Sequence, residues 1–167
     1  MYETTGAKLM HEHTLERNQW VPRPIEEVFD FFSNAANLEL LTPPWLKFEI
    51  VTPQPIAMAP GTLIDYRIHW HFIRLRWRTE IIEWTPPTRF VDIELRGPCK
   101  LWRHTHTFTA ERGGTTIRDQ IRYALPLGSL GALANRLAVA RDVERIFDYR
   151  TQKVAECFGE ISAPAKR

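Results

Sequence analysis

Cysteine is scarce in this sequence of 167 residues, which contains only Cys99 and Cys157 and no Cys-x-x-Cys pair. This scarcity excludes a disulfide framework and a cysteine-based zinc site as the basis of the fold. No apolar run approaches the roughly 20 residues that a membrane-spanning helix needs. Residues 1–13 also lack the apolar segment of a secretory signal peptide. We therefore expect a cytoplasmic protein without stable membrane insertion.

Charge of one sign is equally scarce, since the net charge is only +2. So small an excess gives no reason to expect a nucleic-acid partner. Aromatic residues, in contrast, make up 11% of the chain and include six Trp and nine Phe. The length suits one domain, which we place at residues 13–160, between a flexible N-terminus (1–12) and a flexible C-terminal tail (161–167). The oligomeric state, monomer or homodimer, stays open.

Hydrophobic periodicity changes twice along the chain. A weakly alternating strand at 13–21 is followed by a helix that begins at Pro24, with Ile25, Val28, Phe29 and Phe32 on one face. A second short helix is expected at 36–41. Period-two segments separated by turn residues then predict six strands, at 47–53, 62–71, 74–84, 89–96, 100–110 and 115–124. A long amphipathic helix is expected from about Leu130 to Phe158.

This order predicts an α+β fold. Short connections favour a seven-stranded antiparallel sheet, wrapped around the long C-terminal helix, with two short helices between strands 1 and 2. Because one helix is too narrow to fill a strongly curved sheet, we expect a pocket between sheet and helix.

The hairpin of strands 100–110 and 115–124 gives the inward-facing residues. A turn at residues 111–114 pairs residues whose numbers sum to 225, which places side chains of both strands on one face. These side chains are Trp102, His104, His106, Phe108, Ile117, Asp119, Ile121 and Tyr123. Because a buried carboxylate needs a partner, we expect Asp119 to orient the opposing His106 and to raise the pKa of that imidazole.

The same alternation applies to the other strands. For a hairpin around Phe72-Ile73, the side chains expected to face inward are Ile64, Tyr66, Ile68, Trp70, Leu75, Trp77, Thr79 and Ile81. On the next strand Val91, Ile93 and Leu95 are expected to point inward, and Asp92, Glu94 and Arg96 outward, with Glu94 opposite Arg103. The Arg-rich outer face is interpreted as cross-strand charge pairs, or alternatively as a docking patch for an anionic partner or lipid headgroup.

All six histidines occur as His-x-His pairs, which share a strand face and could chelate a metal. Only His104 and His106 are expected inside, where Asp119 is a third potential ligand. No dedicated motif completes the set, so we predict no metal and no cofactor. The alternatives for this cluster are a hydrogen-bonded lining of the pocket and an acid–base pair.

Several segments resemble the SRPBCC superfamily, also called START-like or Bet v 1-like, with the helix-grip fold. They are Pro24–Ser33, Asn37–Pro44, Trp102–Phe108, Gly114–Tyr123, Pro126–Gly131 and Phe147–Arg150. The similarity extends over residues 13–158. It is strongest to bacterial ligand-binding SRPBCC proteins, a branch also found attached to sugar-nucleotide epimerase-like domains.

The resemblance and the pocket together favour binding of a small hydrophobic molecule such as a lipid, quinone, polyketide or aromatic metabolite. The expected lining is Tyr66, Ile68, Trp70, Trp77, Ile93, Trp102, His104, His106, Phe108, Ile121, Tyr123, Leu137, Phe147 and Arg150. One alternative is a cyclase/dehydratase-like enzyme without metal, in which His106, Asp119 and Tyr123 are catalytic. Another is an interaction module whose pocket is filled by side chains.

Overall fold

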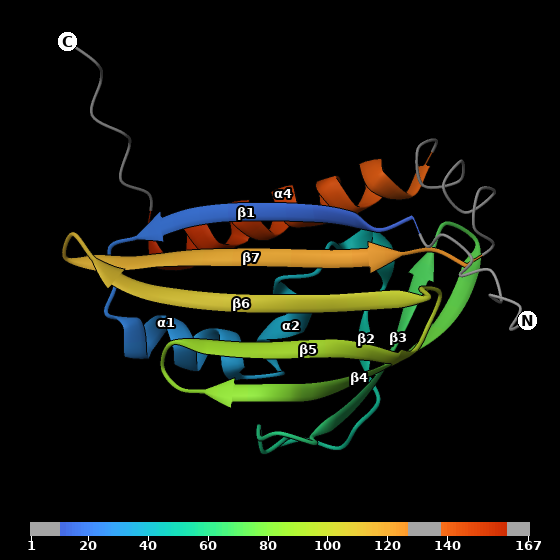
Figure 1. Ribbon diagram of the computed structural model, residues 1–167, viewed down its shortest axis with the longest axis horizontal. Coiled ribbons are helices and arrows are strands. Elements are labelled where there is room, and N and C mark those ends of the chain that lie inside the picture. The colour runs from blue at the N-terminus through green and yellow to red at the C-terminus, as the bar shows by residue number, and fades with distance from the viewer. Residues whose placement is uncertain (1–10, 127–137, 160–167) are drawn as a thin grey trace, which may run out of the picture.

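The computed structural model describes residues 11–126 and 138–159. One antiparallel sheet forms most of the molecule, in the spatial order β1-β7-β6-β5-β4-β3-β2 (Figure 1). Its strands are β1 (His13–Val21), β2 (Glu49–Ile50), β3 (Leu63–Trp70), β4 (Ile73–Thr85), β5 (Arg89–Arg96), β6 (Leu101–Glu111) and β7 (Gly114–Ala124). The predicted seven-stranded sheet is thus confirmed, with a much shorter β2 than expected.

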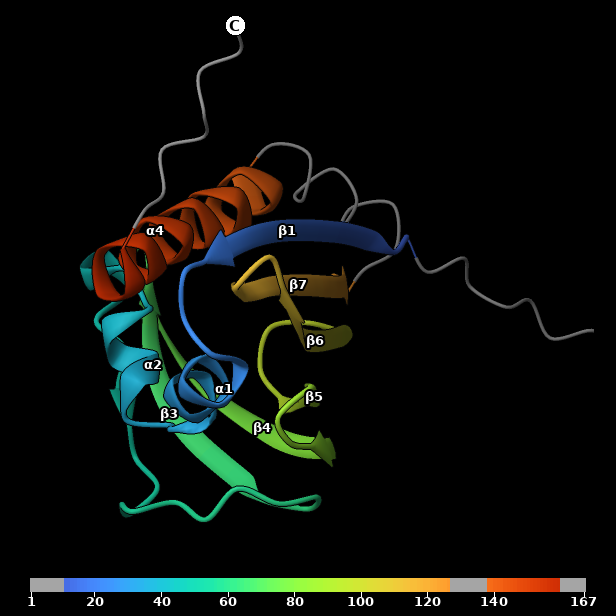
Figure 2. The ribbon, with the colours of Figure 1, turned by 90° about the vertical axis from the view of Figure 1, so that its left-hand side faces the viewer.

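Helices cover the concave face of the sheet. The elements are α1 (Ile25–Ser33), α2 (Asn37–Leu40), the 3₁₀ helix η1 (Pro44–Leu46) and α4 (Ala140–Phe158). The end-on view in Figure 2 shows the sheet curving around α1, with α4 running along the open side. This is the expected helix-grip α+β architecture. The first part of the predicted long helix, Leu130–Leu137, lies outside the described residues.

The β6–β7 hairpin has the predicted register. Trp102 lies opposite Tyr123, and His106 lies opposite Asp119. The two central turn residues, Arg112 and Gly113, have φ values of 53° and 72°, as a tight two-residue hairpin turn requires. The turn chemistry therefore fixes which side chains of both strands face the helix.

Two other registers differ from expectation. The β3–β4 turn lies at His71-Phe72, since Trp70 pairs with Ile73. This moves the pairing by two residues and leaves the faces unchanged. Between β5 and β6, however, Arg103 pairs with Ile93 rather than with Glu94. A one-residue change inverts the faces of a strand.

The inversion of β5 corrects several expectations at once. Asp92 lies opposite His104, and Phe90 lies opposite His106, so both side chains share the inner face with the imidazoles. The expected inward orientation of Ile93 is wrong, as is the expected outward orientation of Asp92. Leu95, another residue predicted to point inward, is half exposed.

The outer face of the sheet carries the expected cross-strand charge pairs. Arg78 Nε lies 2.8 Å from Asp65 Oδ1 on the neighbouring strand. Arg118 Nη2 lies 3.0 Å from Glu16 Oε2. These contacts account for Arg78 and Arg118, whereas Arg76 lies opposite another arginine, Arg67.

An aromatic core lies beneath α1. Phe108 packs against Phe29, Phe32 and Phe90, with ring centroids 5.5, 5.3 and 6.0 Å away. A second cluster joins Ile121 and Tyr123 of β7 to Val143 and Phe147 of α4. Within the described ranges, no helix is both long and apolar enough to cross a membrane.

Candidate functional site

A pocket of about 240 Å³ lies between the inner face of the sheet and α4. It exceeds the roughly 150 Å³ that suffices to bind one benzene molecule in an engineered protein. Most of its wall is apolar, and three of the six Trp side chains contribute to it. Its larger lining residues are Phe32, Phe48, Ile64, Tyr66, Ile68, Trp70, Leu75, Trp77, Ile81, Phe90, Trp102, Ile146 and Phe147.

The structure brings most of the predicted lining residues to this pocket. They are Tyr66, Ile68, Trp70, Trp77, Trp102, His104, His106, Phe147 and Arg150. Four others are elsewhere: Ile93 faces outward, whereas Phe108, Ile121 and Tyr123 are inward-facing but packed into the core beneath the wall. Leu137 lies outside the described residues.

Tyr123 does not reach the position expected of a catalytic donor. Its side chain is 3% exposed and lies in the second core cluster. Its ring packs near Trp102 and His13, with centroids 6.0 and 5.4 Å away. Because Tyr123 is not part of the pocket wall, the expected role as an oxyanion donor has no geometric support.

Asp119 forms the centre of a buried polar cluster at one end of the pocket. Its Oδ1 lies 2.8 Å from His106 Nδ1 and 3.2 Å from His104 Nε2. Its Oδ2 lies 3.4 Å from Arg150 Nε on α4. Arg150 follows Phe147 by three residues, which places both side chains on the inward face of the helix. All three partners of Asp119 are less than one-tenth exposed.

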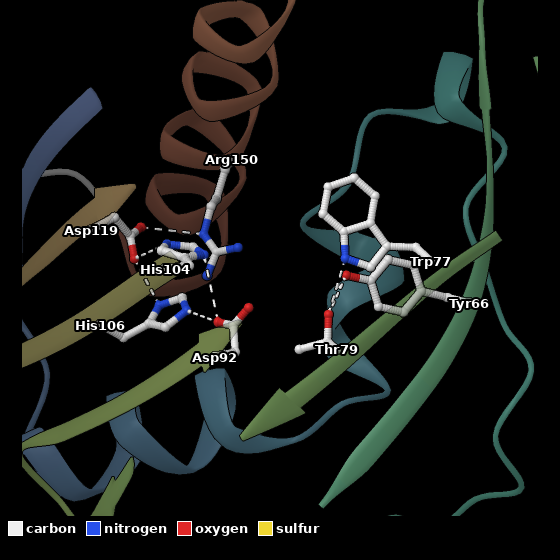
Figure 3. A network of polar contacts seen from close by, with 8 residues as sticks. All are labelled: Tyr66, Trp77, Thr79, Asp92, His104, His106, Asp119 and Arg150. Carbon is white, nitrogen blue, oxygen red and sulfur yellow. Dashed lines mark hydrogen bonds and ion pairs between the residues drawn. The ribbon is translucent and has the colours of Figure 1, made fainter. Parts of the chain in front are cut away.

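Asp92 is the member of this cluster that the sequence analysis missed. Its Oδ2 lies 3.3 Å from His106 Nε2 and 3.8 Å from His104 Nδ1. The two imidazoles therefore lie between two carboxylates, one on β7 and one on β5 (Figure 3). Only the correct β5–β6 register predicts this position of Asp92. Pairing Glu94 with Arg103, as expected from the sequence, assigns Asp92 to the outer face.

Burial and the neighbouring charges separate the two imidazoles chemically. Burial, together with the adjacent His106, lowers the pKa of His104 to about 4. Burial also opposes a charge on His106, but Asp119, together with Asp92, outweighs this effect and raises the pKa, as predicted. Burial likewise opposes a charge on Asp119, yet Arg150 and His106 hold its pKa well below the usual range. At neutral pH, His104 is therefore uncharged and Asp119 is ionised.

A smaller polar group lies across the pocket. The hydroxyl groups of Tyr66 and Thr79 are 2.8 Å apart, and Trp77 Nε1 donates a hydrogen bond to Thr79 Oγ1 at 3.2 Å. Figure 3 shows this group facing the His–Asp–Arg cluster from the β3–β4 wall. Burial raises the pKa of Tyr66 well above its usual value, so the phenol stays protonated. The pocket thus offers hydrogen-bonding groups on two opposite walls.

The beginning of α4 is held to the β3–β4 hairpin at the edge of the pocket. Trp70 Nε1 donates a hydrogen bond to Asp142 Oδ2 at 2.8 Å, and His71 Nε2 lies 3.0 Å from the same oxygen. His71, expected on the outer face, therefore lies in the β3–β4 turn and contacts α4.

The family model for polyketide cyclase/dehydrase and lipid transport proteins matches residues 12–158. The chain therefore belongs to this family, in agreement with the SRPBCC resemblance of its sequence. No curated protein is similar enough to this chain to count as a relative.

Solved structures share the fold. TTHA0849 from Thermus thermophilus is 22% identical, with a TM-score of 0.61 over 87% of this chain and 99% of that chain. Ara h 8.0201 is 18% identical, with a TM-score of 0.56 over 87% and 99% of the two chains. A nucleoside-diphosphate sugar epimerase from Corynebacterium glutamicum is 25% identical, with a TM-score of 0.57. That match covers 85% of this chain but 28% of the epimerase, so it concerns one part of a longer protein.

Proposed function

We propose that this protein binds a small, mostly apolar molecule in the pocket between the sheet and α4. The observation that carries the proposal is the composition of the wall: aromatic and aliphatic side chains surround a space that remains open. Wide apolar surface with a few convergent polar groups is typical of small-molecule sites. Affinity would come from burying apolar ligand surface, at roughly 25 cal/mol per Å² before ordering costs.

The two polar groups would orient the ligand. An oxygen atom of the ligand could accept a hydrogen bond from the His–Asp–Arg cluster, and a second polar atom could reach Tyr66 and Thr79. An aromatic metabolite or polyketide with oxygens at both ends fits this arrangement better than a plain hydrocarbon, because its oxygens would form hydrogen bonds with the polar groups on both walls.

Filling the pocket should weaken binding of an apolar fluorescent probe. Ile68 lines the pocket on β3, so Ile68→Trp would occupy the space that N-phenylnaphthylamine needs. We expect one probe molecule per wild-type chain, and a Kd at least about tenfold higher for the variant, a loss of roughly 1.4 kcal/mol or more. Fluorescence titration measures both quantities.

The matched control is Ile73→Trp, since Ile73 is 55% exposed and lies outside the pocket. It should bind the probe as the wild type does. His106→Ala should change the Kd by only a few fold, because apolar burial dominates the affinity. Equal binding by wild type and Ile68→Trp would overturn the proposal.

The alternative of a cyclase/dehydratase-like enzyme has one supporting observation, the 2.8 Å contact between His106 Nδ1 and Asp119 Oδ1 beside the pocket. A positioned imidazole could move a proton on a bound ligand. In that case His106→Ala would bind ligand yet remove turnover. The third alternative, an interaction module with a filled interior, is disfavoured by the open pocket.

A further inference from the structure

Three potential metal ligands from two neighbouring strands converge at the polar end of the pocket. They are one carboxylate oxygen of Asp92 on β5 and one imidazole nitrogen each of His104 and His106 on β6, and these three atoms lie within 4.8 Å of one another. All three side chains form part of the pocket wall. The set contains two imidazoles and one carboxylate, donors that suit zinc and other divalent transition-metal ions.

The hydrogen bond between Asp92 Oδ2 and His106 Nε2 is long, at 3.3 Å, and this distance also suits two ligands of one ion. A charge-assisted hydrogen bond between nitrogen and a carboxylate oxygen is about 2.7–2.9 Å long. Asp92 Oδ2 lies 3.3 Å from His106 Nε2 and 3.8 Å from His104 Nδ1. Two ligand atoms bound to one tetrahedral ion at about 2.0–2.2 Å lie about 3.3–3.6 Å apart. The distance from Asp92 to His106 falls in this range, and the distance from Asp92 to His104 is slightly longer.

On their other side both imidazoles contact Asp119, through a hydrogen bond for His104 and an ion-pair contact for His106. Their remaining nitrogens, His106 Nδ1 and His104 Nε2, lie 2.8 and 3.2 Å from Asp119 Oδ1. Metal-binding histidines usually contact a carboxylate through the second nitrogen, which orients the ring and selects its tautomer. Arg150 in turn holds Oδ2 of Asp119 from α4. Asp119 thus contacts both imidazoles on the side away from Asp92, and its hydrogen bond to His104 Nε2 orients that ring.

We propose that Asp92, His104 and His106 bind one divalent transition-metal ion, such as Zn²⁺, at the polar end of the pocket. Three protein ligands leave a coordination position toward the pocket, as in catalytic rather than structural zinc sites. An oxygen of the bound molecule could fill that position, a point that rests on the proposed function.

The proposal departs from the sequence-based expectation of no metal for an identifiable reason. That expectation considered the imidazole pair with Asp119 alone and placed Asp92 outside. The structure instead gives Asp119 a positioning role and supplies Asp92 as the third ligand.

Calorimetric titration of the full chain with Zn²⁺, after treatment with a chelator, tests the site. We expect one ion per chain in the wild type. Asp92→Asn should weaken binding by more than about 100-fold, and Asp119→Asn by about 10–100-fold, the loss typical of an outer carboxylate partner. Both substitutions keep the side-chain volume, and circular dichroism would confirm that each variant is folded.

Another His-x-His pair supplies the control. His69 of that pair lies on β3 opposite Arg74 and is not part of the pocket wall, so a His69→Ala variant should bind Zn²⁺ as the wild type does. In the wild type, NMR of the imidazole nitrogens should show Zn²⁺ shifting His104 Nδ1 and His106 Nε2 most. Unchanged affinity in Asp92→Asn, or loss of binding in the control, would overturn the metal site.

The chelator-treated protein separates this inference from the proposed function. Binding of N-phenylnaphthylamine depends on the apolar wall and should persist without metal. If the probe binds and Zn²⁺ does not, the metal site alone fails. If Zn²⁺ binds and the probe does not, the apolar pocket is the part that is wrong.

Discussion

Replacing Asp119 with alanine should lower the free energy of unfolding by about 3–5 kcal/mol, because the change leaves buried cationic groups without their partner. Arg150 is 8% exposed and its Nε contacts Asp119 Oδ2. His106, only 3% exposed, loses the carboxylate that stabilises its protonated form. Urea denaturation, with the slope of the transition compared between proteins, measures the loss.

The matched control is Asp148→Ala, which removes a carboxylate from the same kind of pair at the surface. Asp148 Oδ1 lies 3.0 Å from Arg17 Nη2, but the Asp148 side chain is 67% exposed. Water screens such a pair, so the cost should stay below about 1 kcal/mol. Equal losses for the two variants would mean that the cluster around Asp119 is solvated rather than buried.

Phe108→Ala should cost about 3–5 kcal/mol, the range for removing a fully buried aromatic side chain. Phe108 is 1% exposed and packs edge-on against Phe29 and Phe32. The resulting cavity lies beneath α1, so the surrounding rings would have to collapse into it. The sequence pattern predicts that Phe108 contacts ligand, whereas in the structure it lies in the core.

Phe72→Ala makes the same chemical change at a fully exposed residue of the β3–β4 turn. Its unfolding free energy should stay within about 0.5 kcal/mol of the wild type. Thermal or urea unfolding of both variants provides the comparison. A Phe108→Ala protein of unchanged stability would contradict the core assignment.

The sequence predicts most of the fold because local signals and pairing geometry agree. Glu111 pairs with Gly114 across a two-residue turn, and this turn fixes every pair of the hairpin by simple arithmetic. The helix at Ile25–Ser33 follows from its apolar spacing after Pro24. Such agreement between local chemistry and global arrangement is what makes a segment predictable.

The candidate site was less predictable because it depends on one register. The connection between β5 and β6 contains Gly97, Pro98 and Cys99, and the Cys99 N–H donates a hydrogen bond to Glu94 Oε1 at 3.0 Å. This local contact accompanies a pairing one residue away from the expected one. No periodicity in the strand reveals such a change, since Phe90 and Asp92 alternate with Val91 and Ile93 as plausibly in either orientation.

The tryptophan residues offer the most direct test of the pocket. Trp70, Trp77 and Trp102 form part of its wall. Trp20, Trp45 and Trp84 do not. Each indole N–H gives its own signal in a proton–nitrogen correlation NMR spectrum, so the six side chains form two groups that can be observed together.

Titration of the nitrogen-labelled protein with N-phenylnaphthylamine should shift the indole signals of Trp70, Trp77 and Trp102 in a saturable way. The signals of the other three should hardly move. Single Trp→Phe variants assign each signal. Shifts confined to the second group, or of equal size in all six, would contradict a ligand pocket between the sheet and α4.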